Sequence, residues 1–321
     1  MTTILRIFAL CAACLIPGLA QAETYPSKPV KIIIPFSAGG VTDLGGRLIA
    51  QRLSEKLGQQ FYIENVPGAG GNLGMAQVAR APGDGYTVLL SSSSVTVNPS
   101  LYQKMPFDVE KDLIPVTKAG GSPNSWLVNP SFPAQNMKDL IDLMKKDPGK
   151  YSVGSPGAGT TPSLSIEQLK HDLKVSFVTV PFAGGGPMTQ SLLGGHVPIV
   201  CGAIGNSVEL IKEGKIRALG ITDKKRLETL PNIPTLDELG IKDQEAETIA
   251  GVFVPAGTPR AIVDKLQQEI SAAVRSPDIK ARLLELGIVP DGGSPEEFAA
   301  YVKADIAKWK RVIEQANVPR I

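Results

Sequence analysis

The sequence predicts an α/β protein with two lobes, each a parallel or mixed sheet flanked by helices, and a ligand cleft between the lobes. Three observations predict this fold class. Strand-like apolar runs alternate with helix-like amphipathic runs almost to the end of the chain. The runs form two series, and 321 residues suffice for about two domains. Three strands are followed directly by loops of glycine and other small residues, where such sheets bind ligands.

The first series opens with a strand over residues 30–36, "VKIIIPF", followed by a helix over 42–57. Five apolar residues of this helix fall on one face at helical spacing: Leu44, Leu48, Ile49, Leu53 and Leu57. A strand at 61–65, a helix near 71–80 and a strand at 87–91 complete the series.

The second series is expected to form the other lobe. Its strands are predicted at 125–129, 151–155, 175–180, 197–203 and 216–222, and its helices near 136–146, 161–171 and 185–193. A further strand at 248–256 and helices at 259–275, 277–286 and 295–317 close the chain. The alternation of strands and helices breaks near 120–126 and near 240–250, so we expect the chain to cross between the lobes at these two places. The predicted lobes are 23–124 with 240–321, and 125–239.

Residues 1–22 have the features of a secretory signal peptide. Arg6 supplies a positive charge, an apolar stretch follows, and Ala-Gln-Ala at 20–22 forms a small-x-small cleavage signal. We expect cleavage after Ala22 and export to the periplasm. The alternative, a membrane anchor, needs about 20 unbroken apolar residues. Proline and glycine at positions 17 and 18 interrupt this run.

The cysteine and charge counts exclude several classes of protein. Cys11 and Cys14 leave with the signal peptide, so the mature chain keeps only Cys201 and cannot form an intrachain disulfide. Cys11 occupies the position where a lipoprotein signal carries leucine, which disfavours lipidation of Cys14 without excluding it. The net charge is +2, and Lys and Arg are spread along the chain without a basic stripe. We therefore expect no nucleic-acid partner. We also expect the mature protein to be a monomer.

Three glycine-rich loops follow predicted strands: "SAGGVTD" at 37–43, "VPGAGGN" at 66–72 and "GSPGAGTT" at 154–161. A helix that begins in such a loop offers unpaired backbone N–H groups and about half a positive charge at its amino end. Glycine lets an anion approach these donors, and hydroxyl groups add donors without charge. Two such loops facing each other would hold a carboxylate. The alternative for any one loop is a tight connection only, with Asp43 charging the first turn of its helix.

The sequence offers little for catalysis, cofactors or metals. "GAGGNLG" at 68–74 resembles a dinucleotide-binding loop, but its glycine spacing is one residue too long and it follows the second strand. His171 and His196 are the only histidines, and they do not lie at metal-ligand spacing. Val153 stands where a nucleophile elbow needs glycine, so Ser155 is not supported as a nucleophile. We expect no catalytic residue, no cofactor and no metal site.

Several longer stretches carry a family resemblance. They are "YPSKPVKIIIPFSAGGVTDLGG" through "GDGYTVLLSSSS", then "PFAGGGPMTQSLLGGHV", "IRALGITDKKRLETLPNIPTLDELG" and "GVFVPAGTPRAIVDKL". In this order they resemble the tripartite tricarboxylate transporter receptors, also called the Bug family of periplasmic solute-binding proteins. The resemblance covers essentially the whole mature chain. It implies a two-lobed periplasmic binding protein (type II-like) that closes on a small organic anion and presents it to membrane permease subunits.

The resemblance also implies which residues bind the ligand carboxylate, through main-chain donors, hydroxyls and ordered waters instead of an arginine clamp. The first loop matches the family at Phe36, Gly39, Gly40, Thr42 and Asp43. The second loop matches it at Ser155, Gly157, Gly159 and Thr160. To these expected ligand-binding residues we add Ser91, which ends the strand at 87–91, and Thr161.

The chain departs from the family at three positions. Ser163 stands where many relatives have histidine, Ile249 where they often have tryptophan, and Pro198 follows the "GGHV" turn where they read Val-Asp. If these side chains line the cleft, its far wall is smaller and less polar. The ligand class stays open among dicarboxylates, tricarboxylates, amino acids and aromatic acids.

Three functions fit these observations. We favour a receptor that delivers a carboxylate to a tripartite transporter, because the sequence supplies no base beside a nucleophile. A ligand-sensing accessory of a two-component system and an exported enzyme acting on a small carboxylic acid are the alternatives.

Overall fold

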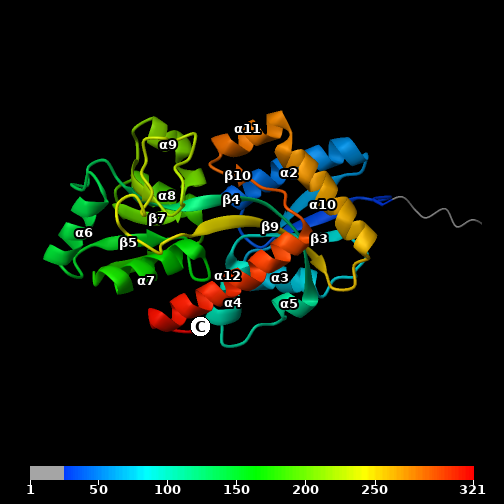
Figure 1. Cartoon of the computed structure of the whole chain (residues 1–321), viewed down its shortest axis with the longest axis horizontal. Coiled ribbons are helices and arrows are strands. Elements are labelled where there is room, and N and C mark those ends of the chain that lie inside the picture. Colours follow the sequence, from blue (N-terminus) through cyan, green and yellow to red (C-terminus); the bar gives the residue numbers. More distant parts are fainter. Residues whose placement is uncertain (1–24) are drawn as a thin grey trace, which may run out of the picture.

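The computed structural model describes residues 25–321, so the predicted signal peptide lies outside the described residues. The chain forms two lobes joined by the long strands β4 and β9, which run from one lobe toward the other (Figure 1). Within residues 25–321, no helix is long and apolar enough to cross a membrane.

The first lobe is built on a sheet in which β1, Val30–Ile34, pairs in parallel with both β2, Phe61–Asn65, and β3, Thr87–Ser91. β9, Glu247–Pro255, is antiparallel to β3. The other elements are η2 Ala69–Gly71, α2 Val41–Leu57, α3 Asn72–Ala79, α4 Ser94–Leu101, α5 Val109–Asp112, α10 Arg260–Arg275, α11 Pro277–Glu285, β10 Val289–Pro290 and α12 Pro295–Gln315.

Helices cover both faces of this sheet, which explains why β1 is apolar at consecutive positions. Ile32 and Ile34 pack in one buried cluster with residues of α2 and α10, whereas Ile33 packs with residues of α3 and α12. Successive side chains of a strand point to opposite faces, so a strand covered on both sides is buried along its length.

The second lobe repeats this arrangement. β5, Ser152–Ser155, pairs in parallel with β6, Val178–Pro181, and with β7, Ile199–Ala203, while β7 and β8, Arg217–Ile221, are antiparallel to β4. Its helical elements are α6 Met137–Lys146, α7 Thr161–Leu173, α8 Gly185–Leu193, η3 Ile204–Asn206 and α9 Val208–Lys212.

The strand β4, Leu113–Val128, belongs to both sheets. Residues up to Pro123 pair with β9, and residues from Asn124 onward pair with β7 and β8. Beside this point the Ala246 amide donates to the Thr222 carbonyl (2.9 Å), and the Asn124 amide donates to the Ala246 carbonyl (3.3 Å). The two segments that cross between the lobes, β4 and the start of β9, are therefore tied to each other and to the end of β8 at this point, which we call the hinge. The lobe bounds 23–124 with 240–321 and 125–239 stay a prediction.

All the predicted helices are present, with ends within two residues of the expected positions. The structure adds α4, α5, α9 and β10, and it begins β4 at Leu113 instead of residue 125. Gly120 and Gly121 made this segment look like a loop. A Cβ on Gly121 would overlap the Glu247 carboxylate, and one on Gly120 would lie 2.8 Å from the Val289 carbonyl oxygen. Glycine is needed here because neighbouring segments pack directly over the strand.

Candidate functional site

A cavity of about 360 Å³ lies between the lobes, where the carboxyl ends of strands meet the amino ends of helices. Its walls come from the loops that precede α2 and α3 in the first lobe and α7 and α8 in the second. This is the position at which open parallel sheets bind ligands.

The amino end of α2 supplies backbone donors to the cavity. Gly40 is its N-cap residue in extended backbone (φ −79°, ψ 163°), and no side chain caps the helix. Among the described residues, no acceptor pairs with the amides of Gly40, Val41, Thr42 and Asp43. Gly40, Val41 and Thr42 line the cavity. These unpaired donors are available to an anion.

Asp43 braces this loop. Its Oδ2 accepts from the Gly39 amide and from Arg47 Nε, and its Oδ1 accepts from Arg47 Nη2 and Asn65 Nδ2, each at 3.0 Å. Asn65 Nδ2 also donates to the Phe36 carbonyl (3.0 Å). Burial would raise the pKa of Asp43, but the hydrogen bonds from Arg47, Gly39 and Asn65 outweigh it and hold the pKa below its ordinary value. Asp43 therefore stays ionised, with both oxygens already used.

The amino end of α7 faces the cavity from the second lobe. Thr160 is its N-cap residue: its hydroxyl donates to the Gly157 carbonyl (2.7 Å) and accepts from the Ser163 amide (3.4 Å). The Gly157 amide donates to Ser155 Oγ (3.3 Å). Gly157 adopts a left-handed φ of +113°, which other residues rarely adopt. Gly157, Thr160 and Thr161 line the cavity.

A third helix end completes the second-lobe wall. Gly184, at φ +115°, is the N-cap residue of α8, and no side chain caps this helix. Gly184, Gly185 and Gly186 line the cavity beside Phe182 and Asn206. The Gly184 amide donates to the Pro156 carbonyl (3.1 Å), whereas the amides of Gly185 and Gly186 have no acceptor among the described residues and extend the donor-rich wall toward η3.

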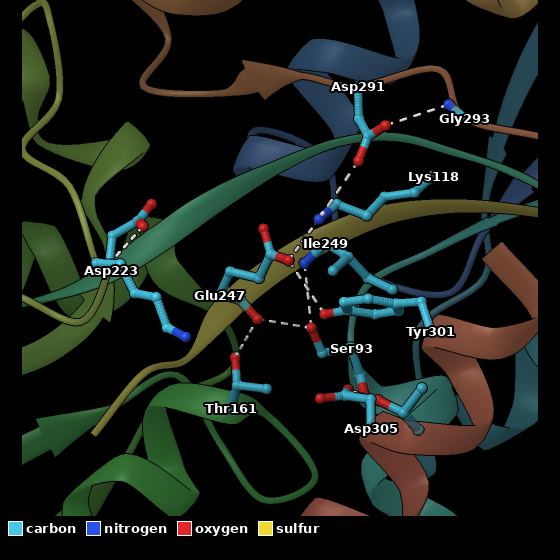
Figure 2. A network of polar contacts seen from close by, with 12 residues as sticks. Ser93, Lys118, Thr161, Asp223, Glu247, Ile249, Asp291, Gly293, Tyr301 and Asp305 are labelled. Carbon is cyan, nitrogen blue, oxygen red and sulfur yellow. Dashed lines mark hydrogen bonds and ion pairs between the residues drawn. The ribbon is translucent and has the colours of Figure 1, made fainter. Parts of the chain in front are cut away.

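One carbonyl ties the cavity to the hinge. Ser93 Oγ and Thr161 Oγ1 both donate to the Glu247 carbonyl, at 2.8 Å and 3.0 Å (Figure 2). Ser93 and Thr161 belong to opposite lobes, and both line the cavity. On the rear of the hinge, the Glu247 carboxylate accepts from Lys118 Nζ (2.5 Å) and from the Tyr301 hydroxyl (3.1 Å). Glu247 therefore links the two lobes next to the site.

The cavity wall carries almost no charge. Of the described residues that line it, none is lysine, arginine or histidine, and Asp43 is the only carboxylate. Burial raises the pKa of Tyr102, which lines the cavity, so its phenol stays protonated and can donate a hydrogen bond. An anion here would be held by backbone dipoles, hydroxyls and helix ends.

The reactive side chains lie elsewhere. Cys201 is fully buried, and burial raises the pKa of its thiol, so it is not a nucleophile at neutral pH. His171 is partly exposed and pairs with Asp172 (2.9 Å). Within the part of the chain that the structure describes, no group of three or more His, Cys, Asp or Glu side chains could hold a metal ion.

The structure brings most of the predicted ligand residues to one cavity. Seven line it: Phe36, Gly40, Thr42, Asp43, Gly157, Thr160 and Thr161. The other four are not part of the lining: Gly39 donates to Asp43, Ser91 Oγ donates to Met75 Sδ, Ser155 accepts from Gly157, and Gly159 packs against Asn98. Their role in binding stays a prediction.

The positions at which the chain departs from the family do not form the wall. Ser163, Pro198 and Ile249 are absent from the lining, and Ile249 is fully buried in the core. The expectation of a smaller and less polar far wall, which depended on these side chains lining the cleft, therefore does not apply to this cavity.

Several wall residues were not predicted as ligand-binding residues from the sequence: Gly68, Gly70, Gly71, Ser92, Ser93, Tyr102, Phe182, Ala183, Gly184, Gly185, Gly186, Asn206 and Thr248. A pattern in the sequence could have predicted that the amino end of α8 lies at the site. "PFAGGGP" follows a strand and precedes a helix, as the two selected loops do.

Two α/β lobes with a ligand-sized cavity between them, lined by helix amino ends, define a solute-binding receptor. A family model described as tripartite tricarboxylate transporter family receptor matches residues 46–318. The chain belongs to this family, which is one of binding proteins and not of enzymes. The fold is that of the periplasmic binding proteins.

Individual relatives agree with this assignment. Protein BugT of Bordetella pertussis (strain Tohama I) is 31% identical over 320 residues, which cover 99% of this chain and 98% of BugT. A solved R. palustris protein with adipate is 34% identical with a TM-score of 0.89, covering 92% of this chain and 100% of that one. MatC from Rhodopseudomonas palustris with bound malate is 32% identical with a TM-score of 0.84, covering 90% and 100%.

Proposed function

We propose that this chain captures a small organic carboxylate between its lobes and presents it, in the closed form, to the membrane subunits of a tripartite tricarboxylate transporter. The observation that carries the proposal is the pairing of the amino ends of α2 and α7 across a cavity whose described lining has no cationic side chain. The sequence features of residues 1–22 support export to the periplasm. We propose that the mature receptor acts as a monomer.

In this proposal the ligand carboxylate accepts hydrogen bonds from the unpaired amides at the start of α2 and from the unpaired amides at the start of α7. Contacts to both lobes stabilise the closed form, because a ligand shifts a conformational equilibrium by its differential affinity for the two states. The adipate and malate in the two solved relatives are dicarboxylates of a size that supports this choice of ligand.

Isothermal titration of protein stripped of co-purified ligand tests the proposal. The panel is adipate, malate, citrate, glutamate and benzoate, with adipamide as an uncharged control. We expect heat of binding from at least one acid and none from adipamide, because the amide lacks the anion that the helix ends attract. An absence of heat with every acid would contradict the proposed function. If at least one acid binds, mass spectrometry of the molecule that co-purifies with the protein would identify the natural ligand.

A further inference from the structure

Two glycines outside the cavity bring the backbones of the two lobes into contact. Gly205 lies in η3 of the second lobe, and Gly287 follows α11 in the first. A Cβ on Gly287 would lie 2.8 Å from Gly205 Cα and 2.9 Å from Val208 Cγ2. A Cβ on Gly205 would overlap the Leu286 carbonyl oxygen and lie 2.7 Å from Val41 Cγ2. In Figure 1, α11 lies at the edge of its lobe nearest to α9.

The second lobe itself does not require glycine at position 205. Gly205 does not have a left-handed φ, and the three atoms nearest to its Cβ position all belong to Val41 and Leu286 of the first lobe. Gly287, by contrast, has φ +62° where α11 ends, a conformation that favours glycine for local reasons. Contact with the first lobe is therefore the reason the structure gives for glycine at 205.

A second contact of the same kind lies between α4 and the loop before α7. A Cβ on Gly159 would overlap Asn98 Oδ1, and this oxygen is buried with no hydrogen-bond partner among the described residues. Asn98 Nδ2 is fixed by the Gly70 carbonyl (2.9 Å) and by Asn72 Oδ1 (2.8 Å), so the side chain cannot swing aside freely. The lobes are thus in contact at two places, and at each place the second lobe contributes a glycine, Gly205 or Gly159.

We propose that the contact between Gly205 and the Leu286–Gly287 backbone is the stop against which the lobes close, and that Gly205 is a positioning residue for ligand binding. Gly205 does not line the cavity. A methyl group at 205 would hold the lobes apart at the start of α2, where Val41 lies. The backbone donors of one lobe would then be too far from an anion bound by the other lobe, because hydrogen bonds weaken steeply with distance and misalignment.

This inference rests on the proposed function, since its effect is measured as carboxylate binding. The variant is Gly205→Ala, and the matched control is Gly194→Ala. Gly194 lies in the same lobe with φ −72°, and the nearest atoms to its Cβ position belong to His196 and Gln190 of that lobe. Both variants are titrated with adipate, malate, citrate, glutamate and benzoate, and small-angle scattering measures the compaction that each acid causes.

We expect Gly205→Ala to bind every acid that the wild type binds about tenfold or more weakly, because only the closed fraction binds tightly. Its ligand-induced compaction should be smaller than that of the wild type, while Gly194→Ala behaves as the wild type does. The melting temperature without ligand should match that of the control, because the proposal requires that the lobes can separate far enough to relieve the contact.

Other results would overturn the proposal. Wild-type affinity and compaction in Gly205→Ala would show that the contact does not limit closure and would leave the proposed function intact. Loss of folding in Gly205→Ala would show that the added methyl group is not accommodated by opening. An absence of binding heat from the wild type with every acid would contradict the proposed function, and with it the role proposed for Gly205.

Discussion

The two loops that face each other across the cavity are braced by different chemistry. In the first lobe a buried carboxylate holds the loop before α2: Asp43 accepts from the Gly39 amide, the Arg47 guanidinium and the Asn65 amide. Arg47 is half-exposed while Asp43 is buried, so the ion pair runs from the surface to the cavity wall. This brace is charged and depends on ionisation.

In the second lobe neutral hydroxyls hold the loop before α7. Thr160 donates to the Gly157 carbonyl and accepts from the Ser163 amide, and Ser155 accepts from the Gly157 amide. The chemistry differs, but each brace uses side chains and leaves backbone donors unpaired. In α7 the free helix-end donor is the Thr161 amide, because Pro162 has no N–H and the Ser163 amide is taken by Thr160. The comparison teaches that a neutral and a charged scaffold can present equivalent backbone donors.

Blocking the donors of the first loop should have the largest effect on binding. In Gly40→Val the backbone angles suit valine, and nothing lies within 4 Å of the Cβ position, so the methyl groups enter the cavity without strain. Hydrogen bonds to charged groups contribute about 1.5–3 kcal/mol each. Loss of one or two should weaken binding about a hundredfold, as measured by titration calorimetry.

The control for Gly40→Val is Gly40→Ala, whose single methyl group should cost less affinity. Both variants should unfold at the wild-type urea concentration. Wild-type affinity in Gly40→Val would show that this loop does not hold the carboxylate.

Removing the charge of the first brace should have the next largest effect. Asp43→Asn presents an amide N–H₂ to donors from Gly39, Arg47 and Asn65, so we expect a loss of about 2 kcal/mol in the free energy of unfolding, the scale of charge-assisted hydrogen bonds. Urea denaturation at pH 7 measures it. The control, Asp142→Asn, removes an exposed carboxylate whose ion-pair partner among the described residues is Lys138, and it should change stability little.

The pH dependence of this variant follows from the sign of the shift. The folded pKa of Asp43 is lowered, so its contribution is fully present above the ordinary carboxyl pKa and is lost as pH falls through the folded value. The difference between wild type and Asp43→Asn should therefore shrink below about pH 4. A difference that is equal at pH 7 and pH 3 would contradict a charged brace.

The sequence predicted the two loops because their signals are local. A strand, a run of small residues and a helical stripe follow one another at 30–57 and again at 151–171, and both helices begin where expected. The class of fold follows from the same alternation. The resemblance to the family then indicated which residues of these loops bind the ligand, and seven of the predicted residues line one cavity.

The remaining wall residues depend on tertiary contacts that no local pattern reports. Ser93 and Tyr102 lie at either end of α4, which the sequence analysis missed because its serine-rich start and Pro99 are atypical of helices. Ser93 reaches the site because it bonds to the Glu247 carbonyl, far away in the chain. Asn206 follows β7 in a short 3₁₀ turn, and only the meeting of the lobes brings it to the cavity.

Weakening the neutral brace should have the smallest effect and should sharpen the comparison most. Thr160→Ala removes the N-cap hydroxyl of α7, a change that costs about 1 kcal/mol of stability in typical helices. Because no ionisable group takes part, this loss should be the same at pH 7 and pH 3, unlike that of Asp43→Asn. Urea denaturation at the two pH values measures it.

The control is Thr160→Ser, which keeps the hydroxyl and should retain most of the stability. Titration calorimetry on both variants should show a loss of affinity smaller than that of Gly40→Val, because the amides at the start of α7 remain in place. If Thr160→Ala destabilises the chain as strongly as Asp43→Asn, or if its effect changes with pH, the two loops do not rest on separate braces. The hydroxyl network of the second lobe would then have to be coupled to an ionised group through the closed cavity.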